Sequence, residues 1–486
     1  MVHPQPLVEK CVIDTGDTTW ILVSTIFVLG MSPALAFFEA GMLRSKNTLS
    51  IISQVFVGNV LLSVMWLFFG YSLSFGTSIL GVIGGLEHVF WIGVPYAECG
   101  PMASNLPAAL FALFQMMFAT ITPLLMTGAY AERLRWDAFL AFTIAWEVLV
   151  YYPVCHWVWG RGFLSRMGVL DYAGGIVIHT TAGAAALVCA LFVGPRRDFA
   201  SFHGEYPPHN LPLAATGAAL LWMGWFGFNG GSALGAGSLA VSSVVSTHVG
   251  ACCSAIVWLF LSMRAHRPAA TGILNGVLAG LAGITPASGY VNTQATIVIG
   301  LACGFLSYHG CQFSKGRLGI DDALDVHMVH GATGALGSLF VGVFGNLRDA
   351  DMGGKFFEFQ SGPKQFLLQV FGVVFVGAYA AVATWGILRT LQGWMGDLTH
   401  DDDRLEIGLD WVDHGEVAYH KLHVLSQPPG DPKGMMSASV GGETGSLHSL
   451  PTEEAYRRRS PNTSAHGPLR SHPSDASGDL PYQTSL

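Results

Sequence analysis

Two histidine residues, His179 and His330, stand in similar sequence contexts. The first is followed by Thr-Thr-Ala-Gly-Ala and the second by Gly-Ala-Thr-Gly-Ala. An imidazole exchanges a proton near neutral pH, so two of them at matching places in a repeat can share a hydrogen bond and line one path. A histidine without such a mate is more often a packing residue. We assign that role to His156, His248, His309 and His327.

Asp171 lies eight residues before His179 and is followed by Tyr-Ala-Gly-Gly. An aspartate in this place is typical of a helix N-cap, because its carboxylate accepts bonds from the first free backbone N–H groups. Eight residues of helix span about 12 Å. We therefore expect Asp171 to cap the helix that carries His179, and its charge to favour an approaching cation.

Aromatic residues gather near the same expected helix ends. Trp157 and Trp159 close one apolar segment, where the ordinary explanation is a belt of aromatic residues at the membrane surface. The face of one of them could also hold a small cation. Phe114, Phe118 and Phe228 could form an apolar constriction below it, although phenylalanines in apolar segments are more often core residues.

Two acidic residues, Glu39 and Glu147, fall inside apolar segments. An ionisable group within a membrane is costly, so each is a candidate for function. We assign both a structural role, in which the carboxyl group bonds to backbone or hydroxyl groups.

The segments that carry these residues predict a membrane protein. Of the 486 residues, 51% are apolar and 12% are charged, whereas soluble domains carry about a quarter charged residues. A helix needs about 20 apolar residues to cross a bilayer, and eleven segments qualify. They are residues 19–43, 50–74, 106–131, 137–159, 172–194, 211–233, 237–263, 270–290, 293–313, 323–346 and 364–392. The sequence thus predicts an all-α polytopic protein with eleven transmembrane helices.

Short motifs repeat between the two halves of this region. Phe38-Glu-Ala-Gly in span one resembles Phe228-Asn-Gly-Gly in span six, and Ala119–Pro123 in span three resembles Ala282–Pro286 in span eight. With the two histidines, the motifs pair spans one, three and five with six, eight and ten. Because five is odd, the second half enters the membrane from the opposite side. Spans 1–5 and 6–10 therefore form an inverted repeat, followed by span 11, and such repeats place the substrate site between the halves.

Lysine and arginine residues predict the orientation. Loops after odd-numbered spans carry ten of them and loops after even-numbered spans carry five, and the richer loops are cytoplasmic. We expect an extracellular N-terminus (1–18) without a cleavable signal peptide, a transmembrane domain (19–396), an ordered cytoplasmic region (397–425) and a disordered cytoplasmic tail (426–486). Arg457-Arg-Arg-Ser-Pro in the tail offers a hydroxyl group to a kinase, although a plain solvated linker is an equal alternative.

The eight cysteines lack metal-ligand spacing, and no nucleotide-binding loop, cofactor motif or soluble enzyme domain is evident. We therefore expect no metal, no cofactor, no enzymatic activity and no nucleic-acid partner. Cys11 and Cys99 fall in the expected extracellular segments, which leaves open a disulfide within or between chains.

Several longer motifs follow one another along residues 14–420. They are Asp14–Trp20, Phe37–Asn47, Gly128–Arg133, Asp171–Gly175 with His179, Gly224–Ser232, Asp325 with Val329–Gly331, and Gly408–Asp410 with His414–Tyr419. In these motifs the chain resembles the Amt/Mep ammonium transporters of the wider Amt/Mep/Rh superfamily. The resemblance implies a homotrimer with one pore per subunit, embedded in the lipid bilayer, that transports ammonium or ammonia and accepts methylammonium as an analogue. The length of the C-terminal tail suggests that the membrane is the plasma membrane.

The resemblance also implies roles for single residues. Phe118, Trp159 and Ser232 match the outer ammonium recruitment site, and Phe118 and Phe228 match a stacked gate lined by Phe114 and Trp225. Asp171 matches the essential aspartate near which ammonium loses its proton, and His179 and His330 match the twin-histidine pair of the pore. One departure is Val417, where some relatives have a threonine that can be phosphorylated.

Two alternatives remain at this point. A Rh-type channel for ammonia or carbon dioxide is disfavoured by Trp159, by eleven rather than twelve spans and by the motif at Gly408–Asp410. An ammonium sensor with a transporter fold would need a partner for its C-terminal tail, and the sequence does not exclude one.

Overall fold

The computed structural model describes residues 11–202, 204, 206–265, 267–345 and 362–419. In these residues, ten helical segments are long and apolar enough to cross a membrane. The elements of the first half are α1 (Thr15–Met42); η1 (Ser45–Asn47), α2 (Thr48–Met65), η2 (Trp66–Gly70) and α3 (Tyr71–Phe75); α4 (Ala108–Leu124) and α5 (Thr127–Tyr130); α6 (Trp136–Trp146), η4 (Glu147–Tyr151), α7 (Tyr152–Val158) and α8 (Phe163–Met167); η5 (Gly175–Thr180) and α9 (Thr181–Val193).

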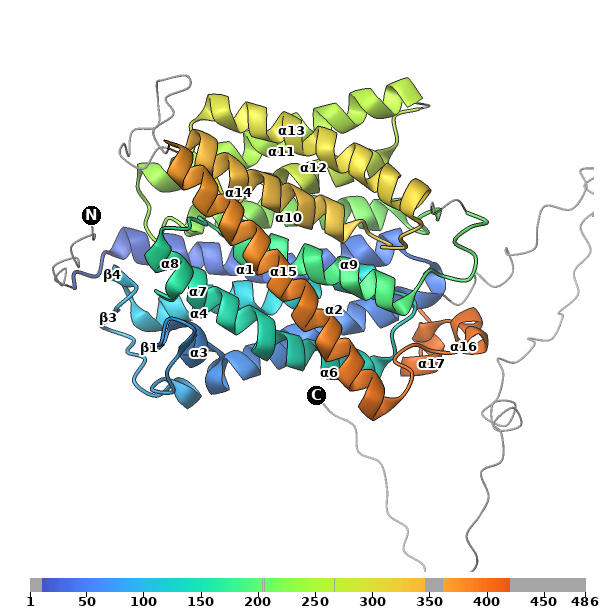
Figure 1. Cartoon of the computed structure of the whole chain (residues 1–486), viewed down its shortest axis with the longest axis horizontal. Helices are drawn as coiled ribbons and strands as arrows, with labels where there is room; N and C mark the ends of the chain where they lie inside the picture. Colours follow the sequence, from blue (N-terminus) through green and yellow to red (C-terminus); the bar gives the residue numbers. More distant parts are fainter. Residues whose placement is uncertain (1–10, 203, 205, 266, 346–361, 420–486) are drawn as a thin grey trace, which may run out of the picture. The chain divides into compact units, whose positions relative to one another are not determined.

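The elements of the second half are α10 (Leu211–Gly231); α11 (Ser238–Ala265); α12 (Ala270–Ile284); α13 (Thr293–Phe313) and η6 (Ser314–Leu318); η7 (His327–Ala332) and α14 (Thr333–Phe344); and α15 (Gly362–Met395). In Figure 1, α11, α12 and α13 lie together, and α15 runs obliquely across α9. All eleven expected segments are helical.

The eighth segment is shorter than expected. Helix α12 ends at Ile284, before the turns of residues 285–291, instead of continuing to residue 290. Pro286 lacks the N–H that an α-helix needs at this position. The turns pack against the start of span five, where the backbone N–H of Tyr172 donates to the carbonyl of Pro286 (3.2 Å).

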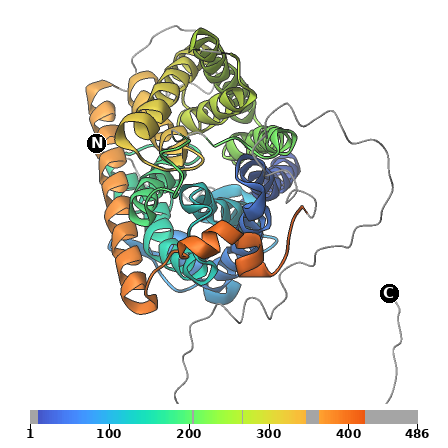
Figure 2. The ribbon, with the colours of Figure 1, turned by 90° about the vertical axis from the view of Figure 1, so that its right-hand side faces the viewer.

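The first spans of the two halves pack along a seam of glycines. A Cβ atom added at Gly217, Gly224 or Gly231 of α10 would lie 2.3–2.6 Å from atoms of Phe38, Met31 or Ser24 of α1. As the numbering rises along α10 it falls along α1, so the two helices are antiparallel. Figure 2, which views the helices nearly end-on, shows α1 (dark blue) beside the green helix α10. Small residues of this kind allow helices to approach closely in lipid.

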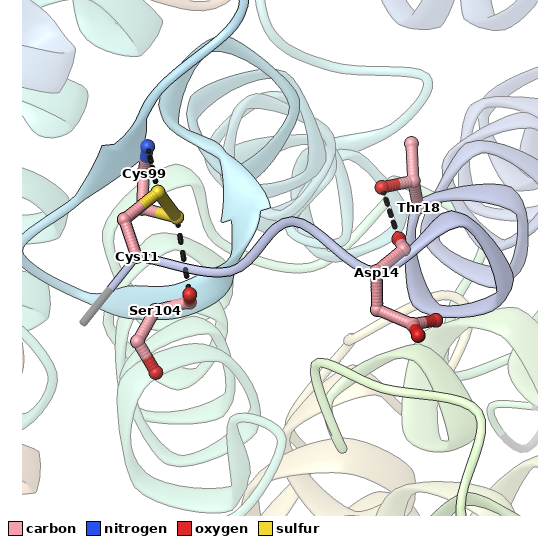
Figure 3. Close-up of a disulfide and its surroundings, with 5 residues drawn as sticks. All are labelled: Cys11, Asp14, Thr18, Cys99 and Ser104. Atoms are coloured by element: carbon pink, nitrogen blue, oxygen red, sulfur yellow. Dashed lines mark hydrogen bonds between the residues drawn. A yellow bond between two sulfur atoms is a disulfide. The ribbon is translucent and has the colours of Figure 1, made fainter. Parts of the chain in front are cut away.

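Two short hairpins lie between α3 and α4, and a disulfide connects the second of them to the segment before α1. The apolar pattern specifies none of these features. Strand β1 (Ser78–Ile79) pairs with β2 (Ile83–Gly84), and β3 (Cys99–Gly100) pairs with β4 (Ala103–Pro107), with the short helix η3 (Val89–Trp91) between the hairpins. The disulfide joins Cys11 to Cys99 within the chain (Figure 3). The N–H groups of Val12 and Asp14 donate to the carbonyls of Ser104 and Asn105 (3.0 Å each), which holds the start of α1 against β4.

A buried ion-pair cluster joins loops at the opposite end of the helices. Arg196 donates to Glu132 (2.8 Å) and, through two nitrogens, to Asp321 (2.7 and 2.9 Å). Arg44 and Asn47 also donate to Glu132 (2.9 Å each). Burial raises the pKa of the Glu132 and Asp321 carboxyl groups, but the guanidinium groups outweigh burial and lower both pKa values. The cluster is therefore fully charged at neutral pH.

The segment after α15 docks on the same end of the molecule. Helices α16 (Asp402–Ile407) and α17 (Leu409–His414) follow Met395. Lys46 donates to the carbonyls of Leu405 and Glu406 (2.7 Å each), and the N–H of Ser50 donates to Asp410 (2.8 Å). Residues 420–486, which include the expected disordered tail and the Arg457–Pro461 motif, lie outside the described residues, as do residues 1–10.

Replacing Arg196 with Met should leave two carboxylates buried without their shared partner, at a cost of about 3–5 kcal/mol. Thermal unfolding of the purified protein in detergent measures this loss. Arg196→Lys keeps the charge but not the planar fork, so it should lose less. Because both carboxyl groups have lowered pKa values in the folded protein, the stabilisation is complete above about pH 4 and should be lost progressively as the pH falls from there toward those lowered values. An unchanged unfolding temperature for Arg196→Met at pH 7 would contradict this.

Candidate functional site

His179 and His330 face each other in the interior. Their Nδ1 atoms are 3.3 Å apart, and their ring centroids are 5.3 Å apart with an interplanar angle of 29°. Both side chains are buried. Because a hydrogen bond between two Nδ1 atoms needs one donor and one acceptor, the two rings must hold different tautomers or protonation states. The predicted meeting of the two histidines is thus present in the structure.

Two π-helical turns and several glycine residues allow the histidines to approach each other. Each stands in a π-helical turn that opens its span, His179 in η5 and His330 in η7. A Cβ added at Gly183 would lie 2.1 Å from the Cα of Gly331, and one added at Gly334 would lie 2.5 Å from the Cβ of His179. The glycines that follow each histidine therefore let spans five and ten cross in close contact.

Asp171 caps the turn that carries His179. One carboxyl oxygen accepts from the N–H groups of Gly174 and Gly175 (2.8 and 2.7 Å), and the other accepts from Ile176 and Val177 (2.7 and 2.9 Å). Burial raises the pKa of the Asp171 carboxyl group, and the four amide bonds act in the opposite direction. Since both oxygens act only as acceptors, the geometry fits the carboxylate form.

Four aromatic rings lead from one end of the molecule to the histidines. The Phe118 ring lies 6.1 Å from Trp159, 4.8 Å from Phe114 and 4.5 Å from Phe228, measured between centroids. Phe228 stacks 6.2 Å from His179. The side chains of Phe114, Phe118 and Phe228 are buried, so these rings form a closed apolar layer above the histidine pair.

Polar groups surround the other side of this layer. The Trp159 indole N–H donates to the carbonyl of Asp171 (2.9 Å), which fixes the ring, and the Ser232 hydroxyl donates to the carbonyl of Phe228 (2.8 Å). The Ser232 oxygen keeps its lone pairs for a hydrogen-bond donor. An open cavity of about 460 Å³ is lined in part by Asp17 and by residues 233–235, which follow Ser232 in the sequence.

Trp225 and a narrow cavity lie on the far side of the histidines. The Trp225 ring stacks on His179 at 5.6 Å, and its N–H donates to Thr285 (2.8 Å). The cavity holds about 20 Å³, and its lining includes His330, Trp225 and Glu39 among mostly apolar residues. The cavity is thus small and mostly apolar, and the imidazole of His330 and the carboxyl group of Glu39 are among its few polar groups.

Residues 19–419 match the family model described as Ammonium Transporter Family. The chain belongs to the ammonium transporter family. It is 56% identical over 410 residues to Ammonium transporter 1 of Dictyostelium discoideum, covering 84% of this chain and 88% of that protein. It is 39% identical over 404 residues to Ammonium transporter Amt1 of Archaeoglobus fulgidus, covering 83% and 99%.

Solved structures give the same result for the fold. Saccharomyces cerevisiae Mep2 superposes with a TM-score of 0.74 and 32% identity, covering 81% of this chain and 90% of that chain. A protein described as Sensor Amt Protein superposes with a TM-score of 0.74 and 28% identity, covering 82% and 98%. The relatives are ammonium transporters and not enzymes. Among the described residues, no three His, Cys, Asp or Glu side chains are grouped as metal ligands.

The two buried glutamates differ from each other. Glu39 accepts a bond from the Thr127 hydroxyl (2.7 Å), as expected for a structural carboxyl group. The same expectation is wrong for Glu147, because neither of its carboxyl oxygens has a hydrogen-bond partner in the described part of the chain. Sequence position indicates burial, but it does not show which side chains from other spans reach the carboxyl group.

Replacing Asp171 should separate its capping role from its charge. Asp171→Ala leaves four buried N–H groups without an acceptor and should destabilise the protein by about 3 kcal/mol or more. Asp171→Asn keeps one acceptor oxygen, so it should unfold at a higher temperature than the Ala variant while still losing most uptake. Thermal unfolding and methylammonium uptake, measured on the same preparations, test this. Uptake at the wild-type rate by Asp171→Asn would show that the charge has no role.

Proposed function

We propose that this ammonium transporter recruits ammonium at Phe118, Trp159 and Ser232, removes a proton near Asp171, and passes ammonia along His179 and His330. The observation that carries the proposal is the unbroken series of rings from Trp159 through Phe118 and Phe228 to the histidine pair. Every ring in this series belongs to a residue that the sequence analysis named as a site candidate, and each ring contacts the next.

The outer residues suit ammonium as a ligand. An aromatic face attracts a cation through its quadrupole, and a hydroxyl oxygen accepts one of the hydrogens of ammonium. Potassium has a similar charge but offers no hydrogen to bond, and it cannot shed a proton. Selection therefore depends on both donation and deprotonation.

The ring layer and the histidines suit a neutral solute. A bare cation that entered the apolar layer of Phe118 and Phe228 would lose its hydration at large cost. Ammonia has no charge to desolvate, and it can both donate to and accept from the imidazole nitrogens of His179 and His330. The carboxylate of Asp171, with no cationic side chain within salt-bridge distance in the described residues, favours the cation only at the mouth.

We also propose a plasma-membrane location, with the N-terminus outside and the C-terminus in the cytoplasm. The Cys11–Cys99 disulfide supports it, because disulfides persist in oxidising compartments. The basic residues Arg44, Arg133 and Arg196 gather at the other end, as cytoplasmic loops do. We further propose a homotrimer with one pore per subunit, as the resemblance to the Amt/Mep family implies.

The docked C-terminal segment favours a regulatory role beside transport. Helices α16 and α17 contact Lys46, Asn47 and Ser50 at the start of span two, so a kinase or other partner that detached the two helices would change this junction. A second candidate function is ammonium sensing with a transporter fold, since one structural neighbour is described as a sensor. Substrate flux in the absence of any partner distinguishes the two.

Purified protein in liposomes should take up methylammonium saturably, and excess K⁺ should compete poorly. The physical reason is that K⁺ neither donates a hydrogen bond nor loses a proton. Radiolabelled uptake with and without K⁺ tests this, with protein-free liposomes as the control. Conduction of K⁺ at a rate equal to that of ammonium would contradict the proposed selection.

Replacing His179 or His330 with Ala should reduce uptake about tenfold or relax selectivity against K⁺, because the passage loses its polar relay. His309 is a matched control, since it is exposed on α13 against the rings of Phe305 and Tyr308. His309→Ala should behave like the wild type. A double variant of His179 and His330 with unchanged rate and selectivity would assign both histidines a packing role.

A further inference from the structure

The backbone on both sides of Ser232 is held by other parts of the chain. Helix α10 ends at Gly231, and Ser232 is the residue that follows it. Before this end, the carbonyl of Gly230 accepts a bond from the indole N–H of Trp20 (3.0 Å). Beyond it, Leu234 has a φ of 54°, in the left-handed region that residues other than glycine rarely adopt. A leucine keeps such a conformation only where surrounding contacts impose it.

The contacts that impose it come from the side chains of Asp17 and Asn105. One carboxyl oxygen of Asp17 accepts from the backbone N–H of Ala236 (2.8 Å), and the other accepts from Nδ2 of Asn105 (2.7 Å). The same Nδ2 donates its second hydrogen to the carbonyl of Leu234 (2.7 Å). The turn after Ser232 is therefore bonded at both of its ends.

These contacts originate in the first turns of α1 and in the second hairpin. Asp17 and Trp20 are three residues apart on α1, so their side chains lie on one face of that helix. Asn105 belongs to β4, which pairs with β3. The Cys11–Cys99 disulfide joins β3 to the segment before α1 (Figure 3). The position of Ser232 thus depends on span one and the hairpin as well as on α10.

The ordinary explanation of an acidic residue in the first turn of a helix is that it caps the helix or complements its dipole. In α1 the cap is Asp14, whose carboxyl group accepts from the N–H of Asp17 (2.8 Å). The carboxyl group of Asp17 instead bonds residues of β4 and of the turn after α10. Capping therefore does not account for the direction of the Asp17 side chain.

The bonded turn lies at the mouth and not in the interior. Asp17, Asn105 and Leu234 all line the open cavity of about 460 Å³. The series of rings from Trp159 to the histidine pair makes its contacts without them. A change in the turn should consequently affect the binding of substrate before it affects the later steps.

We propose that Asp17 is a positioning residue for ammonium recruitment, which together with Asn105 keeps the hydroxyl group of Ser232 where ammonium binds. The proposal rests on the proposed function. Without these bonds Leu234 is free to leave its left-handed conformation, and the end of α10 that carries Ser232 turns with it. Asp171 and the histidines keep their contacts. Loss of Asp17 should accordingly weaken apparent affinity and leave the maximal rate unchanged.

The first test measures KM and the maximal rate of methylammonium uptake into proteoliposomes. Asp17→Ala removes both acceptor oxygens, so KM should rise about tenfold at an unchanged maximal rate. Asp17→Asn keeps one acceptor oxygen and should recover part of the affinity. Asn105→Ala frees the carbonyl of Leu234 without any change of charge, and it should also raise KM. If Asp17 acted only by attracting the cation through its charge, Asn105→Ala would keep the wild-type KM.

The second test asks whether Asp17 acts through Ser232. Ser232→Ala should raise KM, because the hydroxyl group of the recruitment site is lost. Adding Asp17→Ala to Ser232→Ala should then raise KM no further, since the group that Asp17 positions is already absent. Two independent effects would instead multiply in the double variant.

The matched control is Asp14→Ala, which removes the cap of the same helix from the preceding turn. This variant should unfold at a lower temperature but keep the wild-type KM. The positioning role would be overturned by an unchanged KM in both Asp17→Ala and Asn105→Ala, by an equal rise of KM in Asp14→Ala, or by independent effects in the double variant. The proposed function would stand in each of these cases. An unchanged KM in Ser232→Ala would instead overturn the proposed recruitment site, and the positioning role with it.

Discussion

The bonds from four backbone N–H groups to the carboxylate of Asp171 fix the turn that carries His179 at the candidate site. In a lipid environment the first N–H groups of a helix have no water to bond, so they need an acceptor from the protein. Asp171 provides it for η5 and thereby fixes His179. Its carbonyl also holds the Trp159 ring, and its neighbour Tyr172 bonds the turn after α12. Asp171 and Tyr172 together thus join spans four, five and eight.

The corresponding acidic residue in the second half is neutralised. Asp325 precedes η7, as Asp171 precedes η5, and its carbonyl accepts from the N–H groups of Met328 and Val329. However, its carboxyl group pairs with Lys315 at 2.7 Å. The two halves therefore share a backbone plan but differ in charge, because the carboxyl group of Asp171 bonds backbone N–H groups and that of Asp325 bonds a lysine. In the proposed function, this asymmetry would favour a cation at the end that carries Asp171.

Residue patterns were sufficient to predict the membrane-spanning segments and the contact between His179 and His330. Both predictions rest on hydropathy and on sequence repeats, which are properties of the local sequence. They were insufficient where contacts between distant segments decide the outcome. Helix α12 stops at Ile284 although apolar residues continue, since Pro286 ends it and span five covers the turn. The pairing of Cys11 with Cys99 within the chain depends on how the N-terminal segment lies against β4. The isolation of Glu147 depends on side chains from other spans, which no local pattern encodes.

The glycine seam between α1 and α10 has a consequence for biosynthesis. Helix α1 is the first span to leave the ribosome, and the helix that fits its Ser24, Met31 and Phe38 surface is made only after four further spans. Until then that surface must face lipid, the insertion machinery or a temporary neighbour. The first half therefore cannot complete its packing on its own, and assembly of the passage must await the sixth span. Ribosomal pausing within the long loop before α10 would prolong this exposed intermediate.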